Sequence, residues 1–158
     1  MRVPEYVARG LEGLAAIHVA TRDASLVPDE VIAAAAVLSR NGERLTVYLP
    51  DATSATSLAN LRENGAIAVG LSEPRTHRTV QLKGTAEEIR PAREDEREAV
   101  LRHAASFDAQ VEAIGLPPTV LRRRAKWPCH AVTFEVAGAW EQTPGPGAGA
   151  PLAPEERA

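Results

Sequence analysis

Residues 54–71 read SATSLANLRENGAIAVGL. Their first part, residues 54–64, predicts a helix, because hydroxyl side chains suited to capping open it and leucines recur on one face. Gly65 stands where a helix of this kind stops. Residues 66–71 are then apolar enough to form a buried strand. The other elements of the fold are predicted from the segments before and after this unit of helix and strand.

A long strand comes after this unit. Residues 79–89 read TVQLKGTAEEI, so that Val80, Leu82 and Ala86 point to one face and polar side chains point to the other. One apolar face and one wet face are typical of a strand in an antiparallel sheet.

A hairpin is predicted before the unit. Residues 30–38 (EVIAAAAVL) leave helix and strand both open, because four alanines favour a helix although the run is short. The Asn41-Gly42 pair after it is a strong hairpin signal, and residues 45–49 alternate at period two. We therefore predict a strand on each side of the turn. Small side chains in the first strand would let another group approach the backbone closely.

The remaining elements are a short helix at residues 4–13, a strand at residues 15–21, a helix at residues 91–114 and a strand at residues 130–136. Short strands interrupted by helices suit an antiparallel barrel better than a doubly wound sheet, whose strands would each be followed by a helix. The predicted fold class is mainly β (α+β), an antiparallel barrel of about six strands with two to three helices. Residues 1–142 would form one domain, and residues 143–158, seven of them Gly or Pro, a C-terminal tail.

Composition argues against several classes of partner. The 158-residue chain has a net charge of −3, so nothing in it suggests nucleic acid or an anionic membrane. Its single cysteine, Cys129, cannot form an internal disulfide, and no stretch approaches the roughly 20 apolar residues that span a bilayer. Since the N-terminus also lacks the pattern of a signal peptide, we expect a cytoplasmic protein.

Familiar catalytic motifs are missing from the sequence. It contains no Walker-type or GxGxxG phosphate loop, no GxSxG elbow of a serine hydrolase, and no HxH or HExxH spacing among its four histidines. We therefore expect no metal site. The sequence identifies no catalytic acid, base or nucleophile.

Two blocks, residues 54–65 and 74–84, resemble the FMN-binding split barrels around pyridoxamine 5'-phosphate oxidase. That family has Ser-x-Lys entering a helix, Asn-Pro after the helix, and an Arg-Gln-Val strand that reaches a glycine six residues past its arginine. Here residues 64–65 are Asn-Gly, and the interval from Arg78 to Gly84 is the same.

The end of the barrel carries a third similarity. The family ends its barrel with two tryptophans thirteen residues apart, which is the spacing of Trp127 and Trp140. The likeness covers residues 12–142, nearly the whole predicted domain, and it implies an antiparallel split β-barrel.

The resemblance implies a homodimer that binds FMN at the subunit interface and acts as a flavin-dependent oxidoreductase on a small-molecule substrate. Thr79 falls where the family uses a glutamine to hydrogen-bond the flavin, and Trp140 where an indole packs beside the isoalloxazine. Thr56 and Ser57 fall beside the phosphate. The candidate cofactor-binding residues are Ser54, Thr56, Ser57, Arg78, Thr79, Lys83 and Trp140.

The chain departs from the family at charged positions. Ser57 stands in place of the lysine that enters the helix, and Ala33-Ala34 in place of an arginine, so two cations that neutralise the FMN phosphate are missing. Residues 142–149 (QTPGPGAG) have no cation where the oxidase holds the phosphate of its substrate. We therefore expect that this chain does not oxidise pyridoxamine phosphate.

Two other functions stay open. A non-enzymatic split barrel would bind haem or another flat ligand, and the missing cations favour it. A deazaflavin-dependent reductase ranks last, because its longer cofactor would need more basic residues. Individual residues also have structural alternatives: Arg78 as a surface ion-pair residue, Trp140 as core or dimer packing, and the hydroxyl residues of 54–57 as helix caps.

Overall fold

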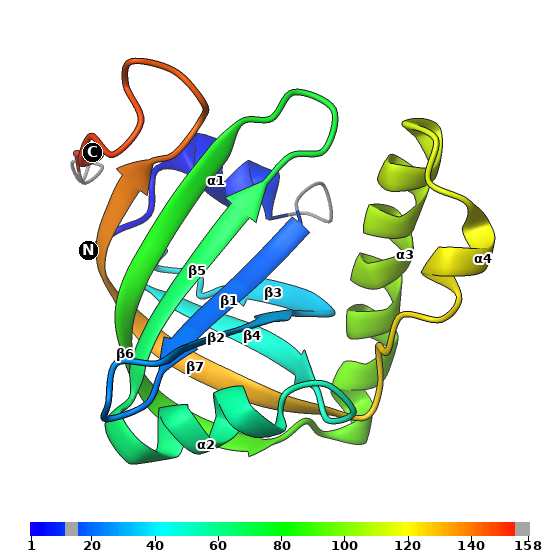
Figure 1. The fold of residues 1–158 in the computed structure, drawn as a ribbon, viewed down its shortest axis with the longest axis horizontal. Coiled ribbons are helices and arrows are strands. Elements are labelled where there is room, and N and C mark those ends of the chain that lie inside the picture. The colour runs from blue at the N-terminus through cyan, green and yellow to red at the C-terminus, as the bar shows by residue number, and fades with distance from the viewer. Residues whose placement is uncertain (12–15, 154–158) are drawn as a thin grey trace.

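The computed structural model describes residues 1–11 and 16–153. Seven strands form one antiparallel sheet in the order β2-β1-β5-β6-β7-β4-β3 (Figure 1). The strands are β1 (Ala16–Arg22), β2 (Pro28–Ile32), β3 (Ala35–Leu38), β4 (Arg44–Pro50), β5 (Ala66–Ser72), β6 (Thr79–Pro91) and β7 (Cys129–Glu141). The helices are α1 (Glu5–Gly10), α2 (Ala55–Asn64), the 3-10 helix η1 (Glu94–Glu96), α3 (Arg97–Ala113) and α4 (Pro118–Leu121).

The sheet curls around the main apolar core, and β2 and β3 are its two free edges (Figure 1). The first part of β6 buries one face, as its alternation predicts: Val80 and Leu82 are buried, whereas Lys83 is exposed. Phe134 of β7 is the largest side chain that is fully buried. The fold is therefore mainly β and split-barrel-like, as the sequence predicts.

The seventh strand comes from a segment for which the sequence predicts one strand. Residues 28–38 form both β2 and β3, which lie at opposite edges of the sheet. The change occurs at Ala33 and Ala34, whose amides donate to different strands, to Ile17 O of β1 at 2.9 Å and to Tyr48 O of β4 at 2.8 Å. The alternation along residues 28–38 is compatible with pairing to β1 or to β4. It therefore does not reveal where the chain changes from one partner strand to the other.

The start of α2 differs from the expected cap. Ser54 occupies the N-cap position, but its hydroxyl makes no capping bond and donates instead to Pro50 O at 2.7 Å. The end of α2 is as predicted. Gly65 has a φ of 70°, in the left-handed region that glycine adopts without cost, and its amide donates to Leu61 O at 2.9 Å.

The helix predicted at residues 91–114 begins later. Pro91 ends β6, η1 follows, and α3 packs against β3 with Val100 and Ala104 buried. The predicted apolar face weakens toward its end, where Ile114 is 54% exposed. Among the described residues, no helix is long and apolar enough to cross a membrane.

The described part of the tail folds back along β7. The amide of Gly149 donates to Glu141 O at 2.7 Å, and that of Leu152 donates to Ala139 O at 2.9 Å. The Leu152 side chain packs against the main core. These bonds cover the edge of β7 beyond the point where β4 begins.

Candidate functional site

The start of α2 is where the resemblance implies an FMN phosphate. Ser57 is fully buried, and its hydroxyl donates to the Asp29 carboxylate at 2.5 Å. Thr56 is exposed. A second carboxylate, that of Asp51, lies just before the helix and hydrogen-bonds His130 at 2.7 Å. The helix therefore begins between two acidic groups.

The two positions that carry a cation in the family do not carry one here. Ala33 and Ala34 are both buried, each 2% exposed, where the family has an arginine. A dianionic phosphate placed against Asp29 would face like charge instead of charge-assisted donors. The residues at the start of α2 do not fit an FMN phosphate.

A second group of candidate residues meets on the outer face of β6 and β7. The Lys83 ammonium lies 4.8 Å from the centre of the Trp140 ring. Gln81 is the ladder partner of Trp140, and Gly138 is the partner of Lys83. A Cβ atom on Gly138 would lie 2.5 Å from Cη2 of the indole, so the ring lies flat across this glycine. The result is a half-buried aromatic platform with a cation above it.

Thr79 is the first residue of β6, and Arg78 directly precedes the strand. The Thr79 hydroxyl hydrogen-bonds that of Ser72 at 2.9 Å, and its amide donates to the Thr143 hydroxyl at 3.0 Å. Arg78 is exposed, with its guanidinium 5.7 Å from the Tyr6 ring centre. Hydrogen bonds from Thr143 lower the pKa of the nearby Glu141 carboxyl, with a smaller contribution from Arg78. This acid keeps its charge at neutral pH.

The seven candidate residues thus form two groups rather than one site. Thr79, Lys83 and Trp140 share the outer face of the sheet, with Arg78 beside them. Ser54, Thr56 and Ser57 lie at the start of α2, which packs against β1, β2 and β5 at the opposite end of the sheet (Figure 1). Within one chain, a flavin at Trp140 could not use all seven residues.

Small side chains cover the outer face of the sheet next to Trp140. They are Ala16 and Ala20 of β1, and Ala66, Ala68 and Gly70 of β5. His18 stands on this floor, and its Nδ1 lies 2.6 Å from a carboxylate oxygen of Glu30. A hollow of about 390 Å³ opens beside Arg22 and Lys83. The alternation of residues 16–22 places Arg22 on this face, a signal that the sequence analysis did not use.

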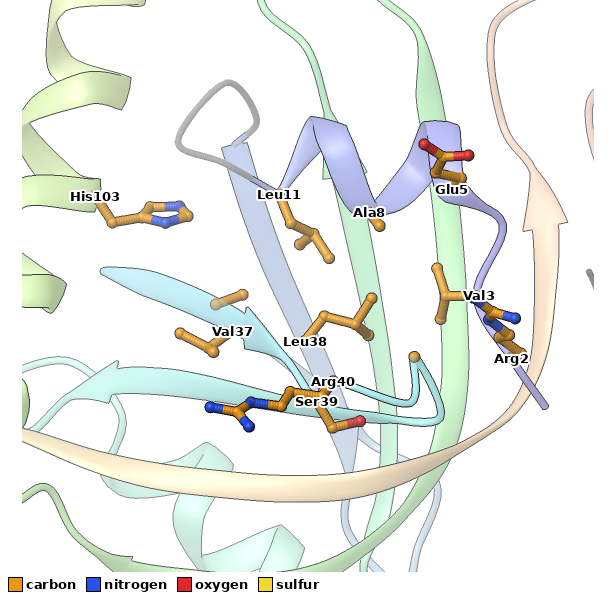
Figure 2. A pocket seen from close by; sticks show the side chains of 12 residues that line it. Arg2, Val3, Glu5, Ala8, Leu11, Val37, Leu38, Ser39, Arg40 and His103 are labelled. Atoms are coloured by element: carbon orange, nitrogen blue, oxygen red, sulfur yellow. The ribbon is translucent and has the colours of Figure 1, made fainter.

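A larger crevice of about 570 Å³ lies between α1, β3 and α3 (Figure 2). Its apolar floor includes Leu11, Val37 and Leu38, and Arg40 lies along its β3 side. His103 reaches into it from α3, and its Nε2 is buried with no hydrogen-bond partner among the described residues. Burial, and then the charge of Arg124, lower the pKa of His103, so the imidazole is neutral at neutral pH.

Sequence reasoning missed this crevice because its walls come from three separated segments, and no motif links them. Within residues 1–11 and 16–153, no three His, Cys, Asp or Glu groups cluster as a metal ion would require. Cys129 is buried, which raises the pKa of its thiol to about 12, so it behaves as the small apolar residue that the sequence indicates.

The curled antiparallel sheet, split between β2 and β3 and carrying a helix between its fourth and fifth strands, defines the class. It is the split-barrel fold of pyridoxamine 5'-phosphate oxidase-like proteins. No protein-family model and no curated protein matches the sequence itself.

Solved structures with this fold include HupZ of Group A Streptococcus, with a TM-score of 0.59, 17% identity, and 94% of this chain and 98% of that chain covered. An F420 reductase matches with a TM-score of 0.56 at 20% identity, over 87% of this chain and 98% of that chain. A pyridoxamine 5'-phosphate oxidase-related, FMN-binding protein of Nostoc punctiforme matches with a TM-score of 0.50 at 10% identity, over 90% and 85%. At these identities the likeness shows the fold.

Proposed function

We propose that this protein binds a flavin on the outer face of β6 and β7, in a seam between two copies of the chain. The observation that carries the proposal is the Trp140 indole, which lies flat over Gly138 with the Lys83 ammonium 4.8 Å from its ring centre. An offset-stacked ring beside this indole gains about 0.5–1.5 kcal/mol beyond the burial of its area. Lys83 is exposed and can move off the indole when a ring stacks there.

The chain's own residues supply binding and electrostatics. A bound flavin supplies hydride or electron transfer. The amide side chain of Gln81, opposite Trp140, offers both a donor and an acceptor to the ring edge. A second copy laid over Ala68 and Gly70 would exclude water from the seam. We therefore propose a homodimeric, flavin-dependent oxidoreductase acting on a small molecule.

The test compares two tryptophans. Riboflavin and FMN are titrated into the wild type, Trp140→Leu and Trp127→Leu, and quenching of flavin fluorescence is recorded. We expect Trp140→Leu to weaken both flavins about two- to tenfold. Trp127, which packs beside α3 away from the platform, is the matched control and should leave both affinities unchanged. Quenching of neither flavin, or equal losses in the two variants, would refute the proposal.

A second candidate function rests on His103. His103 lines a crevice of about 570 Å³, and its neutral imidazole has a buried nitrogen without a hydrogen-bond partner among the described residues. A neutral imidazole of this kind is the type of group that ligates haem iron. In that case the protein would be a haem-binding module with no reaction of its own. Haem titration followed in the Soret region decides this, with His103→Ala as the test variant and the outer-face His18→Ala as its control. A spectrum that is the same in both variants rules out His103 as the ligand.

A deazaflavin reductase activity is the third candidate, in keeping with the fold that this chain shares with an F420 reductase. The outer face supplies Arg22 and Lys83 beside its hollow, which suits a short anionic group better than a long one. FMN is therefore the cofactor that we propose first.

A further inference from the structure

We infer that the phosphate of a bound FMN is held in the hollow between Arg22 and Lys83, and not at the start of α2. This inference rests on the proposed flavin function and assigns a new anion site to it. Three observations support it: the acidic start of α2, the two cations beside the hollow, and the distance between the hollow and Trp140.

The two serines at the start of α2 cannot donate to a phosphate without breaking internal bonds. The Ser57 hydroxyl donates to Asp29 and the Ser54 hydroxyl donates to Pro50 O, so neither hydrogen is free. Both serines are fully buried. The Asp29 carboxylate would also repel the dianion. The arrangement satisfies both serines internally and leaves neither hydroxyl free to donate to an external anion.

The hollow on the outer face has the opposite character. Ala20, Ala66 and Ala68 form its floor and carry no charge, while Arg22 and Lys83 stand beside them. The ladder explains this arrangement, because Lys83 pairs with Ala68 of β5, and Ala68 pairs with Ala20 of β1. Arg22 shares the outer face with Ala20, two residues further along β1.

Both cations are available to a ligand. Within the described residues, neither Arg22 nor Lys83 forms an ion pair with an acidic side chain; Arg22 donates only to the backbone oxygen of Asp23, at 3.2 Å. On the neighbouring strand β2, the carboxylate of Glu30 is held by His18. A guanidinium and an ammonium beside an uncharged floor are a suitable donor set for a phosphate.

The spacing also suits FMN. Trp140 of β7 pairs with Gln81 of β6, which pairs with Gly70 of β5, and Ala68, which lines the hollow, is two residues further along β5. Two strands across and two residues along correspond to about 12 Å between Cα positions, part of which the long Arg22 and Lys83 side chains span. A five-carbon chain and its phosphate span roughly 8–9 Å when extended, at about 1.5 Å for each bond. A ring at Trp140 therefore places its phosphate within reach of Arg22 and Lys83.

The experiment isolates the phosphate by comparing FMN with riboflavin, which lacks it. The affinity ratio of the two flavins is measured by fluorescence quenching in the wild type, Arg22→Ala and Arg122→Ala, where Arg122 is an exposed arginine on the other side of the molecule at α4. We expect the wild type to prefer FMN about tenfold, Arg22→Ala to abolish most of this preference, and Arg122→Ala to retain it. Riboflavin affinity should be equal in all three proteins.

A further variant tests the alternative phosphate position directly. Asp29→Asn removes the charge at the start of α2, and we expect it to leave the affinity ratio unchanged. A ratio that rises in Asp29→Asn, or that stays the same in Arg22→Ala, overturns this inference while leaving flavin binding intact. Quenching by neither flavin in any variant overturns the proposed function and this inference together.

Discussion

Arg90 and Glu96 join β6 to the start of the α3 region through two hydrogen bonds of 2.8 Å each. The same carboxylate accepts the Tyr48 hydroxyl at 3.1 Å and the Arg93 amide at 2.7 Å. These bonds, above all those from Arg90, lower the pKa of Glu96 from its ordinary 4.5 to about 2. Burial and the bond to Glu96 raise the pKa of Tyr48 to about 12. The network fastens α3 to the sheet through ionised groups.

This network predicts a dependence of stability on acid pH. Because the pKa of Glu96 is lower in the folded chain, its contribution is complete above pH 4.5 and is lost as the pH falls toward 2. Glu96→Gln should reduce the free energy of unfolding by about 1–3 kcal/mol at neutral pH, and the difference from the wild type should vanish near pH 2. Urea unfolding at several pH values measures both effects.

The control for this prediction is Glu94→Gln. Glu94 lies in the same 3-10 helix, but its side chain is 74% exposed and pairs with Arg97 at the surface. Surface pairs of this kind contribute about 0–1 kcal/mol. If the two variants lower the free energy of unfolding equally at neutral pH, Glu96 does not contribute more than a surface carboxylate, and the prediction is wrong.

Replacing Gly84 with a larger residue should cause a steric clash between β6 and β7. At this position β6 crosses so close to β7 that a Cβ atom would overlap the Glu135 carbonyl oxygen and lie 2.6 Å from Cδ2 of Phe134. Both atoms belong to a packed sheet, so neither can move cheaply. We expect Gly84→Ala to lower the free energy of unfolding by about 3 kcal/mol. Gly147→Ala, where a Cβ atom would meet nothing within 4 Å, is the matched control and should be neutral within about 0.5 kcal/mol.

Local sequence patterns predicted those parts of the fold that depend on local physics. The α2 helix, its glycine stop and the strand β5 follow from helical spacing, the position of Gly65 and hydrophobicity over 18 consecutive residues, although the predicted serine cap does not form. The alternation in β6 likewise predicted which residues face the core. The split barrel itself came from the spacing between motifs, and the solved structures confirm it.

The features that local sequence patterns did not predict depend on contacts between distant segments of the chain. Ala33 and Ala34 hydrogen-bond to strands on opposite sides of the split, so a single predicted strand became two. Ser57 meets Asp29, 28 residues earlier in the chain, so its hydroxyl is used internally where the resemblance implied a phosphate contact. His103 faces a crevice whose other walls are α1 and β3. None of these relationships leaves a periodic or spaced signal.

Pyridoxamine phosphate should not be a substrate. Residues 142–149 carry no cation, and the described tail is engaged with β7 through the amide of Gly149, which bonds to Glu141 O at 2.7 Å. A substrate phosphate would therefore find no charge-assisted donor in this segment. With FMN supplied, we expect no oxygen-dependent formation of pyridoxal phosphate above the rate without protein. An authentic pyridoxamine 5'-phosphate oxidase in the same assay is the positive control, and turnover at a comparable rate would contradict this expectation.

If the outer face of the sheet is the dimer interface, as we propose, one substitution on it should break the dimer. Gly70 lies between His18 of β1 and Gln81 of β6 in the ladder, and a Cβ atom there would make only an ordinary contact of 3.6 Å with His18. Gly70→Glu should therefore fold normally, but it places a charge on a face that a second copy would bury without a partner for it, at a cost of several kcal/mol. We expect light scattering to give a dimer for the wild type and a monomer for Gly70→Glu, and flavin affinity to fall along with dimerisation. Gly147→Glu adds the same charge in open space and should remain dimeric. A wild-type monomer at micromolar concentration, or a dimer in both variants, would show that this face is not the interface.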